Sequence, residues 1–312
     1  MELGLLLHTG RLVGDDAVQP DLGPFFEQAH KAEELGFDHV WCGDSSRMER
    51  GWGRADCISL LAALAVATRR VRIGVIPLTA PLRHPVLLAH QLATVDVLSG
   101  GRLLVSPGSG KGGPEGLREF ANCSVPYGER GARLSEMLQI MKLLWTQPGV
   151  TYRGRFWQLE DATVFPKPLN RPIPLLVATG RDPRALRRVG RYGDGWFMTT
   201  SDSEAFKDDL AVVRAAARDA GRDPAEISRI GLFATFHLDR HGDKARADAP
   251  RLLEAYFGSH GRGESSPFFG SPKEIGDRLS AYAAAGLGII VARVIDPDVG
   301  RQFELLKEAA RG

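Results

Sequence analysis

The chain has 312 residues, of which 43% are hydrophobic and 25% charged, and its 40 basic and 38 acidic residues leave a formal net charge of +2. This is an ordinary globular composition, and the near balance of charge gives no support for a nucleic-acid-binding or membrane-binding surface. The three cysteines form no Cys-x-x-Cys pair, no signal-peptide pattern opens the chain and no apolar run reaches about 18 residues, so we expect a cytoplasmic protein without a disulfide framework, zinc site or membrane span.

The first third of the chain alternates short apolar runs with helical segments. Gly36 follows one helical segment where a left-handed residue is favoured, and Asp56 and Pro85 are typical of helix starts. Strands are predicted at residues 3–7, 38–42, 71–76 and 102–106, and helices at 22–35, 56–67 and 85–98. Because these strands are continuous apolar runs, we expect a parallel sheet that helices cover.

This rhythm breaks at about residues 107–173, where a helix is predicted at 127–145 and an aromatic hairpin at 151–157. It then resumes with strands at 174–178, 195–198, 230–236 and 288–293, and helices at 185–189, 203–220, 272–285 and 298–310. The polar segment 237–271, with a helical piece at 252–257, is interpreted as a mobile lid or a surface loop.

The repeated units predict an α/β fold, a single (β/α)8 TIM barrel that covers residues 1–312, with the insertion of about residues 107–173 after strand four. An open, doubly wound sheet is the alternative. It is disfavoured because no Gly-x-Gly-x-x-Gly motif follows the first strand.

Ligands of such a barrel bind at the C-terminal ends of its strands. His8 ends strand one, and as a lone histidine it is either a site residue or a structural one. Asp44 and Ser45 follow strand two, where a carboxylate can accept a hydrogen bond from a ring N–H or orient a substrate. The alternative role of Asp44 is a helix cap or turn residue.

Strands three and four end in glycine-containing turns. Residues 74–78 (Gly-Val-Ile-Pro-Leu) predict a bulge or kink that could press the backbone against a flat ring, or simple strand termination. Residues 108–113 let backbone N–H groups approach an anion, with the charge of Lys111 added, although the spacing is not that of a Walker loop.

After strand five, residues 178–183 (Ala-Thr-Gly-Arg-Asp-Pro) lead into a helix. This arrangement can form a phosphate site from helix N-terminal N–H groups, the Thr179 hydroxyl and Arg181. An ordinary capped loop is the alternative.

Taken in order and spacing, several segments resemble the luciferase-like monooxygenase superfamily along nearly the whole chain. The segments are residues 70–78, 83–85, 88–89, 94–96, 98–102, 108–110, 127–137, 144–145, 152–154, 156, 166–168, 172–174 and 193–196.

The resemblance implies a barrel that is usually a homodimer and that uses reduced FMN or the deazaflavin coenzyme F420. The overall pattern is more similar to the F420-dependent branch. The ring would lie across the strand ends near Asp44 and a kink at Val75-Ile76, which is a non-proline cis peptide in deazaflavin relatives, and the phosphate would lie near residues 179–181. The cofactor-binding residues implied are Asp44, Ser45, Val75, Ile76, Pro77, Gly108, Ser109, Gly110, Ala178, Thr179, Gly180 and Arg181.

Two positions depart from the family pattern. Ser45 stands where family members often have a histidine that assists the chemistry, and Lys111 stands where deazaflavin dehydrogenases have a glutamate. A reductase that transfers hydride from the deazaflavin C5 to a small organic substrate fits these changes best, with Lys111, His8 or Asp44 as the catalytic proton donor. The alternatives are an FMN-dependent two-component monooxygenase with a separate cofactor reductase, and a non-catalytic flavin-binding barrel.

Overall fold

The computed structural model describes residues 1–7, 21–44, 54–199, 203–257 and 267–311. His8 and Ser45, two of the predicted site residues, lie outside these ranges. Within the described ranges, the helices are all too short or too polar to cross a membrane.

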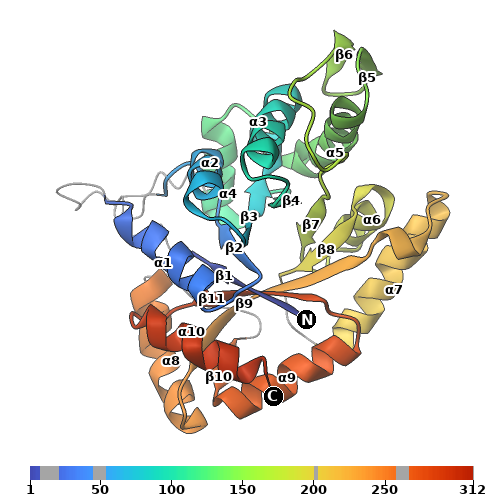
Figure 1. Cartoon of the computed structure of the whole chain (residues 1–312). Coiled ribbons are helices and arrows are strands. Elements are labelled where there is room, and N and C mark those ends of the chain that lie inside the picture. The colour runs from blue at the N-terminus through green and yellow to red at the C-terminus, as the bar shows by residue number, and fades with distance from the viewer. Residues whose placement is uncertain (8–20, 45–53, 200–202, 258–266, 312) are drawn as a thin grey trace.

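Strands and helices alternate along most of the chain (Figure 1). The strands are β1 (Glu2–Leu6), β2 (His39–Cys42), β3 (Arg72–Thr79), β4 (Leu103–Gly108), β5 (Val150–Arg153), β6 (Gln158–Ala162), β7 (Leu176–Thr179), β8 (Gly195–Met198), β9 (Arg229–Leu238), β10 (Phe268–Gly270) and β11 (Ile289–Val294). The helices are α1 (Gly23–Glu34), α2 (Cys57–Ala67), α3 (Pro85–Leu98), α4 (Gly113–Asn122), α5 (Arg130–Thr146), α6 (Pro183–Tyr192), α7 (Ser203–Asp219), α8 (Gly242–Phe257), α9 (Pro272–Ala284) and α10 (Val299–Ala309).

The main sheet closes on itself. Its strands follow the order β4-β3-β2-β1-β11-β9-β8-β7, and each neighbouring pair is parallel. A parallel bridge between Val105 and Leu175 joins the two ends of this path, and β10 pairs with β9 outside it. Helices surround the strands in Figure 1. The prediction of a (β/α)8 barrel is therefore confirmed, and the open sheet is excluded.

Side chains alternate between the barrel interior and the layer under the helices, as the period of two in a strand requires. Trp41 and Ile76 belong to the interior cluster, whereas Val75 packs in the larger outer cluster. Gly74 makes room for the indole ring, because a Cβ at this position would lie 2.4 Å from Cε3 of Trp41. The interior is thus a packed core, and a ligand site has to lie at one of its ends.

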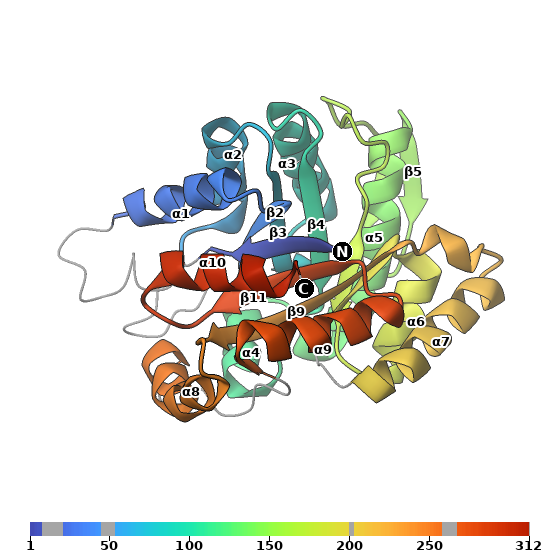
Figure 2. The same ribbon diagram turned by 60° about the horizontal axis from the view of Figure 1, so that its bottom comes forward.

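Most predicted elements have observed bounds within a few residues of the expected ones, and α3 and β8 match theirs fully. The hairpin of β5 and β6 is antiparallel, as predicted. The interpretation of residues 237–271 as a surface loop was wrong for its described parts, because these form the end of β9, helix α8 and strand β10. Residues 258–266 of that segment lie outside the described ranges. Figure 2 shows α4 and α8 beyond the same end of the barrel.

His39 lies next to Trp41 in the barrel interior. The indole Nε1–H donates a hydrogen bond to Nδ1 of His39 at 2.6 Å, and the imidazole is fully buried. This burial, with smaller Coulombic effects of Arg72 and Arg229, lowers the pKa of His39 from 6.5 to about 3. The ring is therefore neutral in the folded protein at neutral pH.

We expect His39 to make the protein sensitive to acid. Between pH 6.5 and about 3, the unfolded chain protonates this imidazole and the folded protein does not, so the unfolded state binds more protons and stability falls as the pH falls. The free energy of unfolding should decrease by up to about 1.4 kcal/mol per pH unit in this window from His39 alone. Urea denaturation of wild type and His39→Asn at pH 7 and pH 5 measures the difference in slope. His90→Gln, on the exposed side of α3, should keep the wild-type slope, and an equally steep decline in His39→Asn would contradict the prediction.

Candidate active site

The C-terminal ends of β3, β4 and β7 meet at one side of the barrel mouth. A Cβ at Gly108 would lie 3.2 Å from Cβ of Pro77 and 3.7 Å from Cβ of Ala178, so three predicted site residues from three strands converge. The absence of a side chain at Gly108 allows this close approach of the three strand ends. Two residues earlier on β4, Ser106 is fully buried, and its Oγ has no hydrogen-bond partner in the described part of the chain.

Strand β3 bends at the predicted place. Its register with β4 shifts between Val75 and Leu78, which is the expected bulge. The expected cis peptide between Val75 and Ile76 is not present: the cis bonds in the described ranges precede Pro166 and Pro172. The bulge produces the bend instead. Ile76 faces the interior cluster and Val75 faces the helix layer, so only the backbone of Val75 can border a ligand at the mouth.

Asp44 follows β2 and is bound by groups at the end of β3. Its Oδ2 accepts hydrogen bonds from the Thr79 backbone N–H at 2.8 Å and from Nη1 of Arg83 at 2.7 Å, and its Oδ1 accepts from Nη2 at 2.9 Å. The Asp44 side chain is 8% exposed and that of Arg83 is 23% exposed. Burial disfavours the charge on Arg83, but hydrogen bonding and attraction to Asp44 outweigh it and raise the pKa of Arg83 above its usual range. This bidentate ion pair fixes the position of the segment after β2 relative to the end of β3.

The loop after β4 packs closely against its neighbours. Gly110 has a φ of +89°, and a Cβ there would lie 2.6 Å from the Phe120 ring, so this position requires glycine. The ammonium of Lys111 forms an ion pair with Glu115 in the first turn of α4. The backbone carbonyl of Lys111 accepts a hydrogen bond from the Tyr127 hydroxyl at 3.2 Å. Lys111 is thus held at the start of α4, at the rim of the mouth.

The loop after β7 differs in two respects from the predicted phosphate site. Asp182 caps α6 and accepts hydrogen bonds from the N–H groups of Arg184 at 2.7 Å and Ala185 at 3.1 Å, so these amides already have a partner. The backbone hydrogen bonds lower the pKa of Asp182, and a carboxylate stands where an anion was expected. Arg181 forms an ion pair through Nε with the buried Asp209 of α7 at 3.0 Å.

The opposite side of the mouth, at β9 and β11, was not predicted from the sequence. The guanidinium of Arg293 on β11 stacks over Phe233 of β9, with Cζ 4.4 Å from the ring centroid, and lies 5.2 Å from the Phe257 ring at the end of α8. Its Nη1 is 3.3 Å from Oγ1 of Thr235. The stacking holds the Arg293 guanidinium at the C-terminal end of β11.

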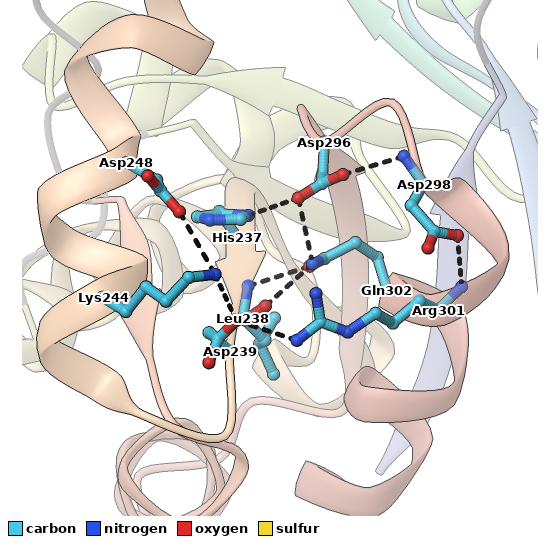
Figure 3. Close-up of polar contacts among 9 residues, drawn as sticks. All are labelled: His237, Leu238, Asp239, Lys244, Asp248, Asp296, Asp298, Arg301 and Gln302. Atoms are coloured by element: carbon cyan, nitrogen blue, oxygen red, sulfur yellow. Dashed lines mark hydrogen bonds and ion pairs between the residues drawn. The ribbon is translucent and has the colours of Figure 1, made fainter.

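A polar network surrounds the C-terminal end of β9 (Figure 3). Nδ1 of His237 lies 3.3 Å from Oδ2 of Asp296, which follows β11. Gln302 of α10 donates to the carbonyl of Leu238 and accepts from its N–H, both at 2.8 Å. Asp239 pairs with Lys244 of α8 and Arg301 of α10 at 2.9 and 2.8 Å. The network ties β9, α8, α10 and the end of β11 together.

Comparisons with known proteins define the family of this chain. The chain matches the family model described as luciferase-like monooxygenase over residues 1–285. It is 33% identical over 257 residues to an F420-dependent glucose-6-phosphate dehydrogenase of Amycolatopsis mediterranei, a match that covers 78% of this chain and 75% of the relative. Three further relatives with that name are covered over 60–62% of their length, so the chain spans about three fifths of them.

Solved structures agree with this assignment. The monooxygenase RslO1 from Streptomyces bottropensis has 26% identity and a TM-score of 0.79, over 99% of this chain and 98% of that one. An F420-dependent secondary alcohol dehydrogenase, in complex with an F420-acetone adduct, has 21% identity and a TM-score of 0.79 over 99% and 97%, which shows a shared fold. The fold is a (β/α)8 barrel like those of these solved structures. The chain belongs to the luciferase-like monooxygenase family.

Proposed function

We propose that this chain is a coenzyme F420-dependent oxidoreductase that transfers a hydride between the deazaflavin C5 and a small organic substrate. The observation that carries this proposal is the convergence of Pro77, Gly108 and Ala178 from the C-terminal ends of β3, β4 and β7, the end at which (β/α)8 barrels bind their ligands. Relatives named as F420-dependent agree with the expected cofactor. Bound there, the deazaflavin would supply the hydride chemistry.

The protein's part is to bind and orient. The buried Oγ of Ser106, which lacks a partner in the described ranges, would hydrogen-bond a polar edge of the ring. Ile76, Ser109 and the Gly110 backbone would contact the ring, and residues 179–181 would take the phosphate through the Thr179 hydroxyl, the Gly180 backbone and Arg181. Asp44 would position the bend of β3 through Thr79, because both of its oxygens already accept hydrogen bonds. Lys111 remains a candidate proton donor at the rim.

Parallel fluorescence titrations of the purified protein with F420 and with FMN test the proposal. Binding of F420 at least tenfold tighter than FMN supports it. The reverse order would favour an FMN-dependent monooxygenase, a candidate that the 26% identity to RslO1 keeps open. In that case labelled oxygen should appear in the product when a reductase supplies reduced FMN. Tight F420 binding without turnover on any substrate would favour a non-catalytic barrel.

Thr179→Asp is expected to weaken F420 binding by about tenfold or more, because a second carboxylate beside Asp182 opposes the phosphate charge; 1.4 kcal/mol suffices for this effect. The dissociation constant from fluorescence titration is the measurement, repeated at high salt, where the loss should shrink. Ser280→Asp introduces the same charge on an exposed position of α9 and should leave the affinity unchanged. Equal affinities of Thr179→Asp and wild type would remove this loop from the site.

We further propose a cytoplasmic homodimer. Large exposed apolar side chains on α2, α3 and the loop after β6 support an interface there: Val66, Leu87, Leu98, Phe165 and Leu169. Light scattering of the wild type and Leu87→Glu tests the dimer.

A separate reductase that supplies the reduced cofactor is also part of the proposal if the reaction consumes reduced cofactor.

A further inference from the structure

His237 lies at the C-terminal end of β9, on the face that lines the barrel. Phe233, four residues earlier, packs against the interior cluster, whereas Phe236 and Leu238 belong to the outer cluster. Because strand side chains alternate, His237 shares the inner face with Phe233. Catalytic groups of (β/α)8 barrels come from this end of the strands, and Asp296 follows the neighbouring barrel strand β11.

The imidazole of His237 is buried without a hydrogen bond. It is 3% exposed, and neither ring nitrogen has a hydrogen-bond partner in the described ranges. Its Nδ1 is within ion-pair distance of Asp296, at 3.3 Å, but the angles are not those of a hydrogen bond. A buried polar group without a partner is unfavourable by about 1–3 kcal/mol and is rare. Such a group can form a hydrogen bond with a polar group of a substrate.

Asp296 is fixed in place beside this imidazole. One carboxylate oxygen accepts a hydrogen bond from the Asp298 N–H at 2.8 Å, and the other lies 3.5 Å from Nε2 of Gln302. Gln302 is itself bound to both backbone groups of Leu238, next to His237 in the chain. A carboxylate at Nδ1 favours the tautomer with its proton on Nδ1, which leaves the lone pair on Nε2.

Charged groups face His237 from three sides in Figure 3: Asp296 after β11, Asp239 after β9, and Lys244 and Asp248 on α8. Burial lowers the pKa of His237 and outweighs the three carboxylates, which raise it. The ring is therefore neutral near neutral pH. A neutral imidazole can accept a proton but does not readily donate one.

We propose that His237 is the catalytic base of the reaction proposed above, and that Asp296 is the residue that positions it. The inference rests on that proposed function and gives it a direction. A carbinol substrate passes its O–H proton to Nε2 of His237, its C–H bond breaks and delivers a hydride to the oxidised cofactor, and a C=O bond forms. The substrate loses two electrons, the cofactor gains them, and the imidazolium releases its proton to solvent. This direction is opposite to the reduction that Ser45 and Lys111 favoured in the sequence.

Nuclear magnetic resonance of protein labelled at histidine tests the position of His237 without turnover. His237→Gln identifies the His237 signals by their loss. Saturation with F420 should shift these signals, and 2-propanol added to the complex should shift them further. Signals of His237 that do not respond to either probe would overturn the proposal.

Kinetics test the role of His237 as a base. The substrates are F420 and either 2-propanol or glucose 6-phosphate, and turnover is followed as the loss of absorbance at 420 nm. The rate of this loss should increase with pH until His237 is deprotonated and then become constant. His237→Gln should lower kcat by about 100-fold or more and abolish this acid limb, within the range of general-base effects. Asp296→Asn removes an anion that raises the pKa of His237. The acid limb of the pH–rate profile should therefore move to lower pH, and the loss of kcat should be smaller than in His237→Gln. An acid limb that persists in His237→Gln would overturn the proposal.

Affinity for F420 separates this proposal from the proposed function. His237→Gln and the control His90→Gln should both keep the wild-type dissociation constant, and His90→Gln should keep the full rate and pH profile. Failure of the wild type to bind F420 would instead overturn the proposed function. A wild type that binds F420 but whose His237 signals respond to neither probe would overturn the proposal for His237 and leave the proposed function standing.

Discussion

Replacing Arg83 by methionine is expected to destabilise the protein by about 3 kcal/mol and to weaken cofactor binding together with it. The methionine side chain retains much of the apolar contact of arginine but leaves the 8%-exposed carboxylate of Asp44 without its cation. The remaining hydrogen bond from Thr79 cannot compensate a buried charge. Because that bond joins Asp44 to the last residue of β3, the bulge that carries Pro77 should lose its support.

Urea denaturation measures the loss of stability, and F420 titration measures the loss of affinity. A double-mutant cycle with Asp44→Asn isolates the coupling, because the asparagine removes the charge that Arg83 balances. The double variant should be less destabilised than the sum of the single ones. Arg69→Met, an exposed arginine before β3, should change stability by less than about 0.5 kcal/mol. Additive effects of Arg83→Met and Asp44→Asn would show that the pair contributes nothing beyond its separate contacts.

The barrel could be predicted from the sequence because its signals are local. Asp56 and Pro85 stand at the starts of α2 and α3, and Gly36, with a φ of +73°, ends the helical segment of α1. Helix α4 was missed because its first turns are rich in glycine and proline. It is supported by tertiary contacts, including the Phe120 ring against Tyr127. Only the end of helix α8 was predicted, as the helical piece at 252–257, because the preceding polar sequence contains Pro250 and resembles a loop.

The candidate site could be predicted only in part, because half of it depends on long-range pairs. The glycine and proline signals that mark the ends of β3 and β4 are local, and their convergence follows from the fold. The partner of Asp44 is 39 residues away, and that of His237 is 59 residues away. Nothing in one sequence joins His237 to Asp296, since a histidine before a polar segment is equally typical of a loop. The first pair exists because β2 lies beside β3 in the barrel, and the second because β9 lies beside β11.

Replacing Gln302 by leucine is expected to have the largest effect on stability, a loss of about 2–5 kcal/mol. The side chain is fully buried, and its amide satisfies both the N–H and the carbonyl of Leu238 at 2.8 Å. Leucine has a similar volume but no polar group, so two backbone groups lose their partner, each at a cost of about 1–3 kcal/mol. Glu304→Leu places the same residue on an exposed position of α10 and should change stability by about 0.5 kcal/mol or less.

Hydrogen exchange of the Leu238 amide determines whether the loss arises where the structure places it. In Gln302→Leu this amide should exchange faster than amides of β2 and β3, because the break is local to the end of β9. Uniformly faster exchange across the barrel would mean that the variant unfolds globally and that Gln302 supports the core. The local result has a functional consequence, since Gln302 also borders Asp296. A variant that remains folded, with its F420 affinity intact but the pH profile of its turnover altered, would tie the orientation of Asp296 to this one buried amide.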